Sequence, residues 1–276
     1  MTHVRWSVTV VAVAAVVALS APAVEAGAPE ATTSSIRGRT EPVPSRGVRP
    51  GEATQPLATN LPKPRFTTTP RNIKPHAMLE KYETTPRPAF LIAEGCTNLA
   101  RGKPVTSSDP MPIIGELPLV TDGDKESMEG SYVELGPGLQ WVQIDLGRRC
   151  LLYAILLWHR HTEGCVYHDV VVQVSDDPDF IKGVCTVFNN DYDHSAGLGI
   201  GRDLEYIEDH QGRLFDAAGA CGRYVRLYSA GSIDDDTNHY TEVEVHGKPA
   251  TSWAGSGGRD PARNPCGISG PRTSTE

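Results

Sequence analysis

Apolar and polar residues alternate over short stretches in the second half of the chain, and turn residues separate the stretches. In residues 140–146 a period of two places Val142, Ile144 and Leu146 on one face, as in a strand that packs one face on a core. The sequence predicts strands over residues 132–135, 139–146, 151–159, 166–175, 186–189, 224–228 and 240–246. No long segment has the 3.6-residue period of an amphipathic helix. The pattern therefore predicts an all-β fold, an antiparallel β-sandwich or jelly roll.

The composition of the flanks divides the chain into four parts. Residues 1–26 combine a positively charged start with an apolar run of about 12 residues, which is typical of a signal peptide and, alternatively, of a retained anchor. Residues 27–95 contain 11 of the 22 prolines and few aromatic residues, so we expect a disordered linker. Residues 248–276 are expected to be a disordered tail. The remaining 152 residues, 96–247, suffice for one domain with a single core.

Charge is distributed unevenly along the chain. The whole chain has 26 Lys and Arg against 34 Asp and Glu, a formal net charge of −8. Residues 96–247 hold 11 basic and 25 acidic residues, a net charge of −14, whereas residues 27–95 hold 10 and 6, a net charge of +4. A nucleic-acid binder needs a cationic face, so nucleic acid and anionic membranes are poor partners for this domain. No predicted loop has adjacent exposed aromatic or Leu residues, and we expect no membrane insertion.

The cysteine content agrees with an exported chain. None of the six cysteines has the C-x-x-C spacing of a zinc or redox site. Disulfides are the default in an oxidising compartment. Cys165 and Cys185 flank one predicted strand and are one candidate pair, and Cys96 and Cys266 bracket the domain and are another. Free, buried thiols are the alternative.

Three stretches of the sequence resemble discoidin-type domains. Residues 98–105 (Asn-Leu-Ala-Arg-Gly-Lys-Pro-Val) resemble their opening, and residues 141–147 (Trp-Val-Gln-Ile-Asp-Leu-Gly) resemble their central strand. Residues 223–227 and 242–247 resemble their last two strands, with His246 where Tyr is usual. The folded part is thus similar to the coagulation factor V/VIII C-type (discoidin) family, which is close to family 32 carbohydrate-binding modules and fucolectins. The resemblance implies a jelly roll of about eight strands, often with a structural calcium, and ligands held by loops at one end.

A calcium site is predicted at a tight turn. Asp122 and Asp124 place two carboxylates around Gly123, and calcium is bound by carboxylate and carbonyl oxygens. In the resembling family a distant Glu of the final strand completes the site, and Glu242 matches that position. Glu242 and Glu244 alternate with two valines, so both are expected to point away from the core. Calcium bound by Asp122, Asp124 and Glu242 is therefore predicted, with an ordinary Asp-Gly turn as the alternative.

Sugar-binding chemistry gathers at two predicted strand ends, residues 158–161 and 238–240. Aromatic faces stack on sugar C–H groups, while Arg, His and amide side chains bond hydroxyl groups. A third segment, residues 189–193, imitates an EF-hand but lacks Gly and Glu at the required positions, and is interpreted as a rim loop. The predicted ligand-binding residues are Trp158, Arg160, His161, Asp191, His194, Asn238, His239 and Tyr240. The alternative is that Trp158 belongs to the core and the histidines bond the backbone.

The function that these features favour is a secreted, non-catalytic carbohydrate-binding module that recognises extracellular glycan. A protein-binding adhesion or scaffold module with a cell-surface partner is the first alternative. A metal-dependent hydrolase centred on His159 and His161 is the second, although no G-x-S-x-G or H-E-x-x-H motif occurs.

Overall fold

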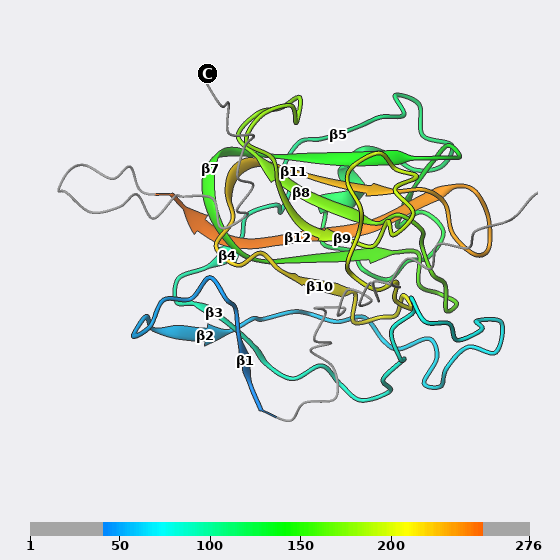
Figure 1. The fold of residues 1–276 in the computed structure, drawn as a ribbon, viewed down its shortest axis with the longest axis horizontal. Helices are drawn as coiled ribbons and strands as arrows, with labels where there is room; N and C mark the ends of the chain where they lie inside the picture. Colours follow the sequence, from blue (N-terminus) through cyan, green and yellow to red (C-terminus); the bar gives the residue numbers. More distant parts are fainter. Residues whose placement is uncertain (1–40, 251–276) are drawn as a thin grey trace, which may run out of the picture. The chain divides into compact units, whose positions relative to one another are not determined.

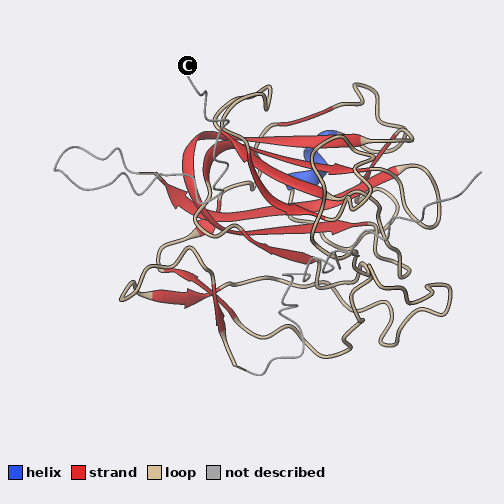
Figure 2. Ribbon diagram, in the orientation of Figure 1, coloured by secondary structure: helices blue, strands red, loops and turns tan. Residues whose placement is uncertain are grey.

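The computed structural model describes residues 41–250, which form an all-β fold that is antiparallel except for the parallel pair β1 and β3 (Figures 1 and 2). The main sheet contains β4 (Thr97–Asn98), β5 (Val105–Ser107), β6 (Val133–Leu135), β7 (Gln140–His159), β8 (Val171–Ser175), β9 (Cys185–Asn189), β10 (Arg213–Asp216), β11 (Cys221–Ser229) and β12 (Asn238–Pro249). A short 3-10 helix, η1, covers Leu117–Thr121. Within residues 41–250 no helix has the length and hydropathy needed to span a bilayer. The predicted signal peptide lies outside the described residues.

The long strand β7 bends and so belongs to both layers of a sandwich. Its first half pairs with β5 and β11, and β11 continues the layer through β8 to β9. Its second half pairs with β10 and β12. The sequence predicts two strands here; the structure joins them through three exposed residues, 147–149, that remain extended. The bend therefore folds one strand over the core that it helps to enclose.

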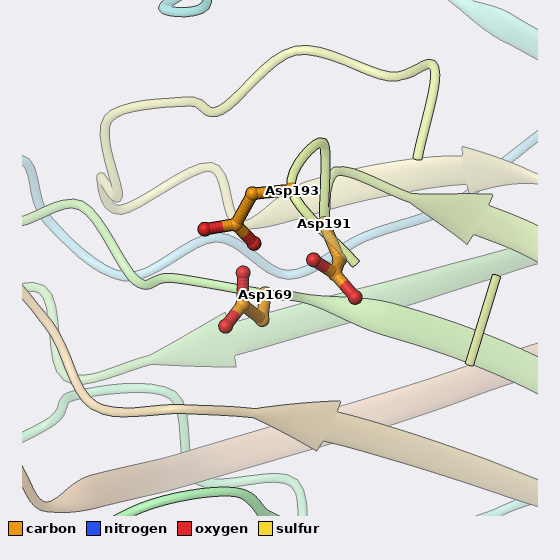
Figure 3. A group of neighbouring side chains, drawn as sticks. All are labelled: Asp169, Asp191 and Asp193. Carbon is orange, nitrogen blue, oxygen red and sulfur yellow. The ribbon is translucent and has the colours of Figure 1, made fainter. Parts of the chain in front are cut away.

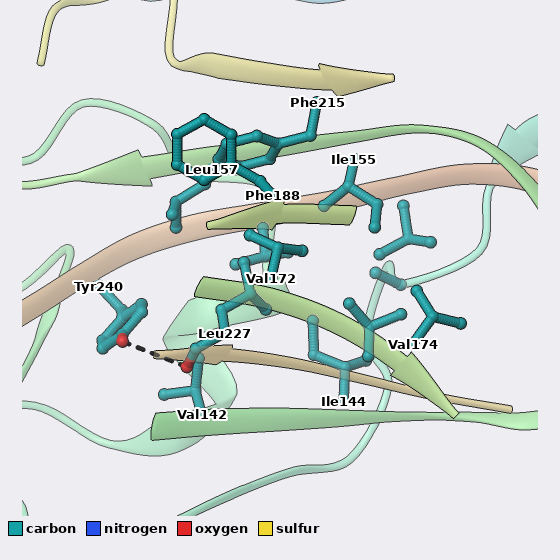
Figure 4. Close-up of a cluster of buried hydrophobic side chains, with 14 of the residues drawn as sticks. Val142, Ile144, Ile155, Leu157, Val172, Val174, Phe188, Phe215, Leu227 and Tyr240 are labelled. Atoms are coloured by element: carbon teal, nitrogen blue, oxygen red, sulfur yellow. Dashed lines mark hydrogen bonds between the residues drawn. The ribbon is translucent and has the colours of Figure 1, made fainter. Parts of the chain in front are cut away.

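The central core lies between the two layers (Figure 4). Val142 and Ile144 from the first half of β7 are buried, and so are Ile155 and Leu157 from its second half. The predicted alternation of residues 140–146 is thus confirmed, because the apolar positions face this core. Within it, the Tyr240 hydroxyl donates a hydrogen bond to the Leu227 carbonyl at 3.3 Å (Figure 4).

The N-terminal segment, residues 41–95, is part of the domain and not a disordered linker. It forms a three-stranded sheet, β1 (Val43–Pro44), β3 (Phe90–Ala93) and β2 (Thr54–Pro56), with β3 in the middle. Phe90 and Ile92 are buried against the outer face of β7, where Ala154, Leu156 and Trp158 complete a second apolar cluster. The prediction of disorder is wrong from residue 41 onward, because the few apolar residues of the segment are covered by an apolar sheet face. Residues 27–40 lie outside the described residues.

Ion pairs and hydrogen bonds hold the segment at several points. Glu80 forms a bidentate pair with Arg213 of β10, with N–O distances of 2.6 and 2.7 Å, and both side chains are largely buried. Asp216 accepts hydrogen bonds from the Ser45 hydroxyl at 2.6 Å and from the Arg46 guanidinium at 2.8 Å. Lys248 pairs with Glu52 at 2.8 Å. The segment is thus fastened along its length by charged groups of the main domain.

The C-terminal boundary and the cysteine pairing also differ from the prediction. Strand β12 continues to Pro249, so the first residues assigned to the tail belong to the domain, and residues 251–276 lie outside the described residues. Cys96 and Cys165 are free, buried thiols, so neither of the two suggested disulfides is present. The Cys165 sulfur turns toward the carbonyl of its neighbour, Val166, at 3.9 Å, instead of toward β9.

Candidate functional site

A narrow pocket lies where β7 ends and β12 begins, and its interior has a volume of about 10 Å³, enough for about one water molecule. Its wall comes from the segment after β7 and from the loop between β11 and β12. The lining residues are Arg160, Thr162, Glu163, Cys165, Tyr167, Ser232, Asp234, Asp235 and His239. Of the predicted ligand-binding residues, Arg160 and His239 are in this pocket.

Strand pairing brings the two predicted strand ends together. Tyr240 pairs with His159, which places the residue after His159 beside the first residues of β12. The two loops are also tied to each other, because Tyr167 forms an antiparallel bridge with Ser232, and the Ile233 N–H donates to the Val166 carbonyl at 3.0 Å. Backbone hydrogen bonds therefore set the mouth of the pocket.

Arg160 is half-buried, and within residues 41–250 its guanidinium has no hydrogen bond or ion pair. Five N–H donors in a fixed fork are costly to leave unpaired as they leave water. A planar guanidinium without a partner at the wall of a pocket can donate hydrogen bonds to a pair of hydroxyl groups or to a carboxylate of a ligand. Arg160 is thus the residue of this pocket with the most unused bonding capacity.

His239 and Tyr167 form a fixed polar pair in the wall of the pocket. Burial lowers the pKa of His239, although the nearby carboxylates of Asp235 and Glu134 oppose the shift. Burial also raises the pKa of Tyr167 well above its usual value, so the phenol stays protonated. The Tyr167 hydroxyl therefore donates to Nδ1 of a neutral His239 across 3.0 Å. The proton of the imidazole is then on Nε2, which lies 3.5 Å from the Thr237 hydroxyl.

The other residues predicted at the two strand ends do not line the pocket. The Trp158 ring is completely buried on the outer face of β7, its Nε1–H donates to the His210 carbonyl at 3.1 Å, and Lys125 lies over the ring. His161 is buried, and its Nε2–H donates to the Lys125 carbonyl at 2.9 Å. The prediction of ligand contact is wrong for both residues. The alternative interpretation is correct for these two residues: the tryptophan is part of an apolar core, and the histidine forms a hydrogen bond with a backbone carbonyl.

Asn238 and Tyr240 also serve the fold and not a ligand. The Asn238 amide donates to the Gly136 and Gly138 carbonyls, both at 2.9 Å, and its oxygen accepts from the Ser229 hydroxyl. The Tyr240 hydroxyl is bonded inside the core. Both side chains are completely buried, because the start of β12 is covered on both faces. The predicted ligand role is wrong for these residues as well.

Asp191 and His194 belong to a separate acidic loop. Asp169, Asp191 and Asp193 place carboxylate oxygens within 4.8 Å of one another (Figure 3). Asp191 is buried and accepts from the Ser195 and Ala196 backbone N–H groups at 2.9 and 3.0 Å, so it closes its own loop. Burial raises the pKa of Asp169, and the charges of Asp191 and Asp193 add to the shift. His194 is exposed and, like Asp191, is not among the residues that line the pocket.

The predicted calcium loop does meet the last strand. The Gly123 N–H donates to Glu242 Oε2 at 2.9 Å, and the φ of +84° at this position suits only glycine. Glu242 is completely buried opposite Trp158, its Oε1 has no hydrogen-bond partner, and burial raises its pKa to about 8. As predicted, Glu242 and Glu244 point away from the central core. A buried carboxylate oxygen without a partner is costly unless a cation or proton meets it.

Two carboxylates of this loop, Asp122 and Asp124, and Glu242 of β12 fit a calcium ion in part. Asp124 accepts from the Glu126 N–H at 2.9 Å and from the Ser131 hydroxyl at 2.8 Å, and Asp122 accepts from the Asp124 N–H. In the part of the chain that the structure describes, the group of acidic side chains close enough to share an ion is the one at Asp169, not this one. A calcium ion here would use Glu242 Oε1 together with backbone carbonyl oxygens of the loop.

Several lining residues were not predicted from the sequence. Asp234 and Asp235 follow a recognised turn, Ala230-Gly231-Ser232, and a run of three aspartates after a turn was a usable signal of a polar loop. Tyr167 and Cys165 gave no signal, because their positions depend on the bridge between two loops that are far apart in the chain.

Comparisons with known proteins give similar structures at low identity. No family model and no curated protein matches the chain. A family 89 glycoside hydrolase from Clostridium perfringens aligns with 55% of this chain at 18% identity and a TM-score of 0.41, and the chain spans only 15% of that enzyme. A fucose-binding module from Streptococcus pneumoniae aligns with 54% of this chain and 96% of the module, at 18% identity and a TM-score of 0.40.

A third similar structure is the CBM32 of AlyQ in complex with 4,5-unsaturated mannuronic acid. It aligns with 51% of this chain and 92% of that module, at 15% identity and a TM-score of 0.38. The similar structures thus include carbohydrate-binding modules of the kind that the sequence resembles. At these identities and TM-scores the likeness transfers neither a ligand nor a set of site residues.

Proposed function

We propose that this chain is an exported, non-catalytic carbohydrate-binding module that holds a glycan in the pocket beside Arg160. The observation that carries the proposal is the half-buried guanidinium of Arg160, which has no partner within residues 41–250 and lines a pocket with carboxylates, hydroxyls and an imidazole. Sugar hydroxyls both donate and accept, so a mixed wall of this kind satisfies them. The interior of the pocket is too small for a sugar ring, so a glycan would lie across its rim, and we expect modest affinity for a single sugar.

The two alternatives find less support in the geometry. His159 and His161 each keep one ring nitrogen without a partner, but these nitrogens are buried away from solvent, so neither is accessible to a metal that must also bind substrate and water. A protein-binding module would use exposed apolar side chains such as Met111 and Ile113, which are 81% and 56% exposed in the loop after β5. These residues are not part of the pocket. A partner held by them would not be displaced by sugar.

Replacing Arg160 tests the proposal directly. We expect Arg160→Ala to weaken glycan binding by about ten- to a hundredfold, because charge-assisted hydrogen bonds contribute about 1.5–3 kcal/mol each. Affinity is measured by calorimetry with the glycan that a glycan array selects. Arg148→Ala removes the same charge at the exposed bend of β7 and should leave the affinity unchanged. Equal binding by the Arg160 variant, or no retention of the wild-type chain by any glycan, would contradict the proposal.

We also propose that calcium stiffens the loop that carries Asp122 and Asp124. The support is the buried Glu242 Oε1 without a partner, beside a glycine turn. We expect calcium to raise the melting temperature of the wild-type chain and to leave that of Glu242→Gln unchanged, since the amide cannot supply the anionic oxygen. Asp193→Asn, on the separate acidic loop, should keep the response. A response lost in the Asp193 variant and kept in the Glu242 variant would place the ion at the other loop.

A further inference from the structure

The pocket beside Arg160 carries more negative than positive charge. Glu163, Asp234 and Asp235 contribute three carboxylates to the wall, and Arg160 contributes one guanidinium. The remaining titratable groups of the wall are His239, Tyr167 and Cys165, which burial keeps uncharged near neutral pH. The wall therefore has a net charge of about −2, in a domain whose charge is itself strongly negative.

These carboxylates retain bonding capacity. Within residues 41–250 the Glu163 carboxylate has no hydrogen bond or ion pair. Asp234 is exposed, its backbone N–H donates to the Ser232 hydroxyl at 3.2 Å, and its carboxylate is bonded to the Cys165 thiol, which leaves its negative charge in place. Asp235 uses Oδ1 to accept hydrogen bonds from the Thr237 N–H and hydroxyl, at 3.0 and 2.8 Å, which leaves Oδ2 without a hydrogen bond within residues 41–250. At least two carboxylates of the wall thus have no cationic partner within residues 41–250.

The charge of a sugar determines how tightly a negatively charged wall binds it. An ammonium group beside two carboxylates makes charge-assisted hydrogen bonds, which are about twice as strong as neutral ones. The acetamide that replaces it in an N-acetylated sugar makes only neutral bonds. A uronic acid brings a further carboxylate, which the surrounding acidic groups repel. Arg160 alone cannot offset that repulsion, because the wall contains three carboxylates and only one guanidinium.

We infer that the pocket selects a glycan with a free ammonium group, a glucosamine-type amino sugar, over N-acetylated and uronic-acid glycans. The inference rests on the proposed function, since it names the ligand class of the same site. Arg160 bonds the hydroxyl groups of the sugar, and Glu163 and Asp234 receive the ammonium group.

Calorimetry with three short oligomers tests this on the full chain. The probes are a glucosamine oligomer, the N-acetylglucosamine oligomer of the same linkage and length, and a galacturonate oligomer, at about pH 5.5, where carboxylates are ionised and the sugar amine is protonated. The glucosamine oligomer should bind about tenfold more tightly than its acetylated counterpart, and the galacturonate oligomer more weakly than both. Added salt should reduce the difference in affinity between the glucosamine oligomer and its acetylated counterpart, because salt screens exposed charges.

Two kinds of variant distinguish the effect of the carboxylates in the pocket wall from the effect of the net charge of the domain. Asp234→Asn and Glu163→Gln should each reduce the preference for the glucosamine oligomer severalfold. Asp236→Asn removes the next aspartate of the same run, which does not line the pocket, and should preserve the preference. Equal or tighter binding of the acetylated or uronic-acid oligomer, or a preference unchanged in both wall variants, would overturn the inference and leave the proposed function standing. Binding of no glycan by the wild-type chain would overturn the proposed function itself.

Discussion

A chain that begins at residue 96 is expected to lose most of its stability. The outer face of β7 would expose Trp158 and Leu156, which Phe90 and Ile92 cover in the intact protein. Removing one buried Phe side chain alone costs about 3–5 kcal/mol. The truncation removes several such contacts, while a whole domain is stable by only about 5–15 kcal/mol.

The same truncation would leave a buried charge without its partner. Arg213 would lose the bidentate pair with Glu80, although its guanidinium still stacks on the Phe188 and Tyr206 rings. Breaking a buried pair by removing one partner is strongly destabilising. Urea unfolding of chains that begin at residue 41 and at residue 96 measures the difference, and Phe90→Ala in the longer chain gives the single-residue effect. Equal unfolding midpoints for the two chains would show that the segment is dispensable.

Glu208→Ala is expected to cost about 3–5 kcal/mol of unfolding free energy. Glu208 and His159 are completely buried and form a pair with an Nδ1–Oε1 distance of 2.5 Å. Removing the carboxylate leaves the His159 ring with both nitrogens unbonded, since its Nε2 already lacks a partner. The ring also stacks on Tyr167 at a centroid distance of 4.1 Å, so the variant should disturb the wall of the pocket and weaken glycan binding.

A double-mutant cycle measures the interaction free energy between Glu208 and His159 apart from the contacts that each makes with other residues. Glu208→Ala, His159→Ala and the double variant are unfolded in urea, and we expect the double variant to be far less destabilised than the sum of the single ones. Lys81→Ala breaks an exposed pair with Glu83 and should cost less than about 1 kcal/mol. A Glu208 variant as stable as the Lys81 variant would contradict the role assigned to the buried pair.

Local pattern was sufficient for most of the main strands and for part of the site. The strands that alternate or are continuously apolar, such as β8 and β12, were predicted because a period of two is set by the backbone itself. The contact between the turn at Gly123 and Glu242, which the family resemblance and not local pattern implied, is confirmed. Arg160 was predicted because it follows a strand, and the pocket at that position contains it.

The errors have a common physical origin. Trp158 and Tyr240 stand beside His, Arg and Asn residues at two predicted strand ends, which suggested that they face a ligand. Both faces of β7 and β12 are covered at these positions, one by the central core and the other by residues that are distant in sequence. The segment from residue 41 was predicted to be disordered because it is Pro-rich, yet its few apolar side chains are buried by a sheet face that a local pattern cannot reveal.

By itself the sequence determined the all-β class, most strands of the main sheet and the acidic character of the domain, because each depends on residues within a few positions of one another or on composition; the contact of the Gly123 turn with Glu242, 119 positions away, was expected only from the family resemblance. Only the tertiary structure decided which polar residues reach a ligand. That depends on the bend of β7, on the pairing of β7 with β12 and on the N-terminal sheet over the outer face, which together bury Trp158, His161 and Tyr240 and leave Arg160 at the pocket. Burial is a property of the assembled layers, and no single segment contains it.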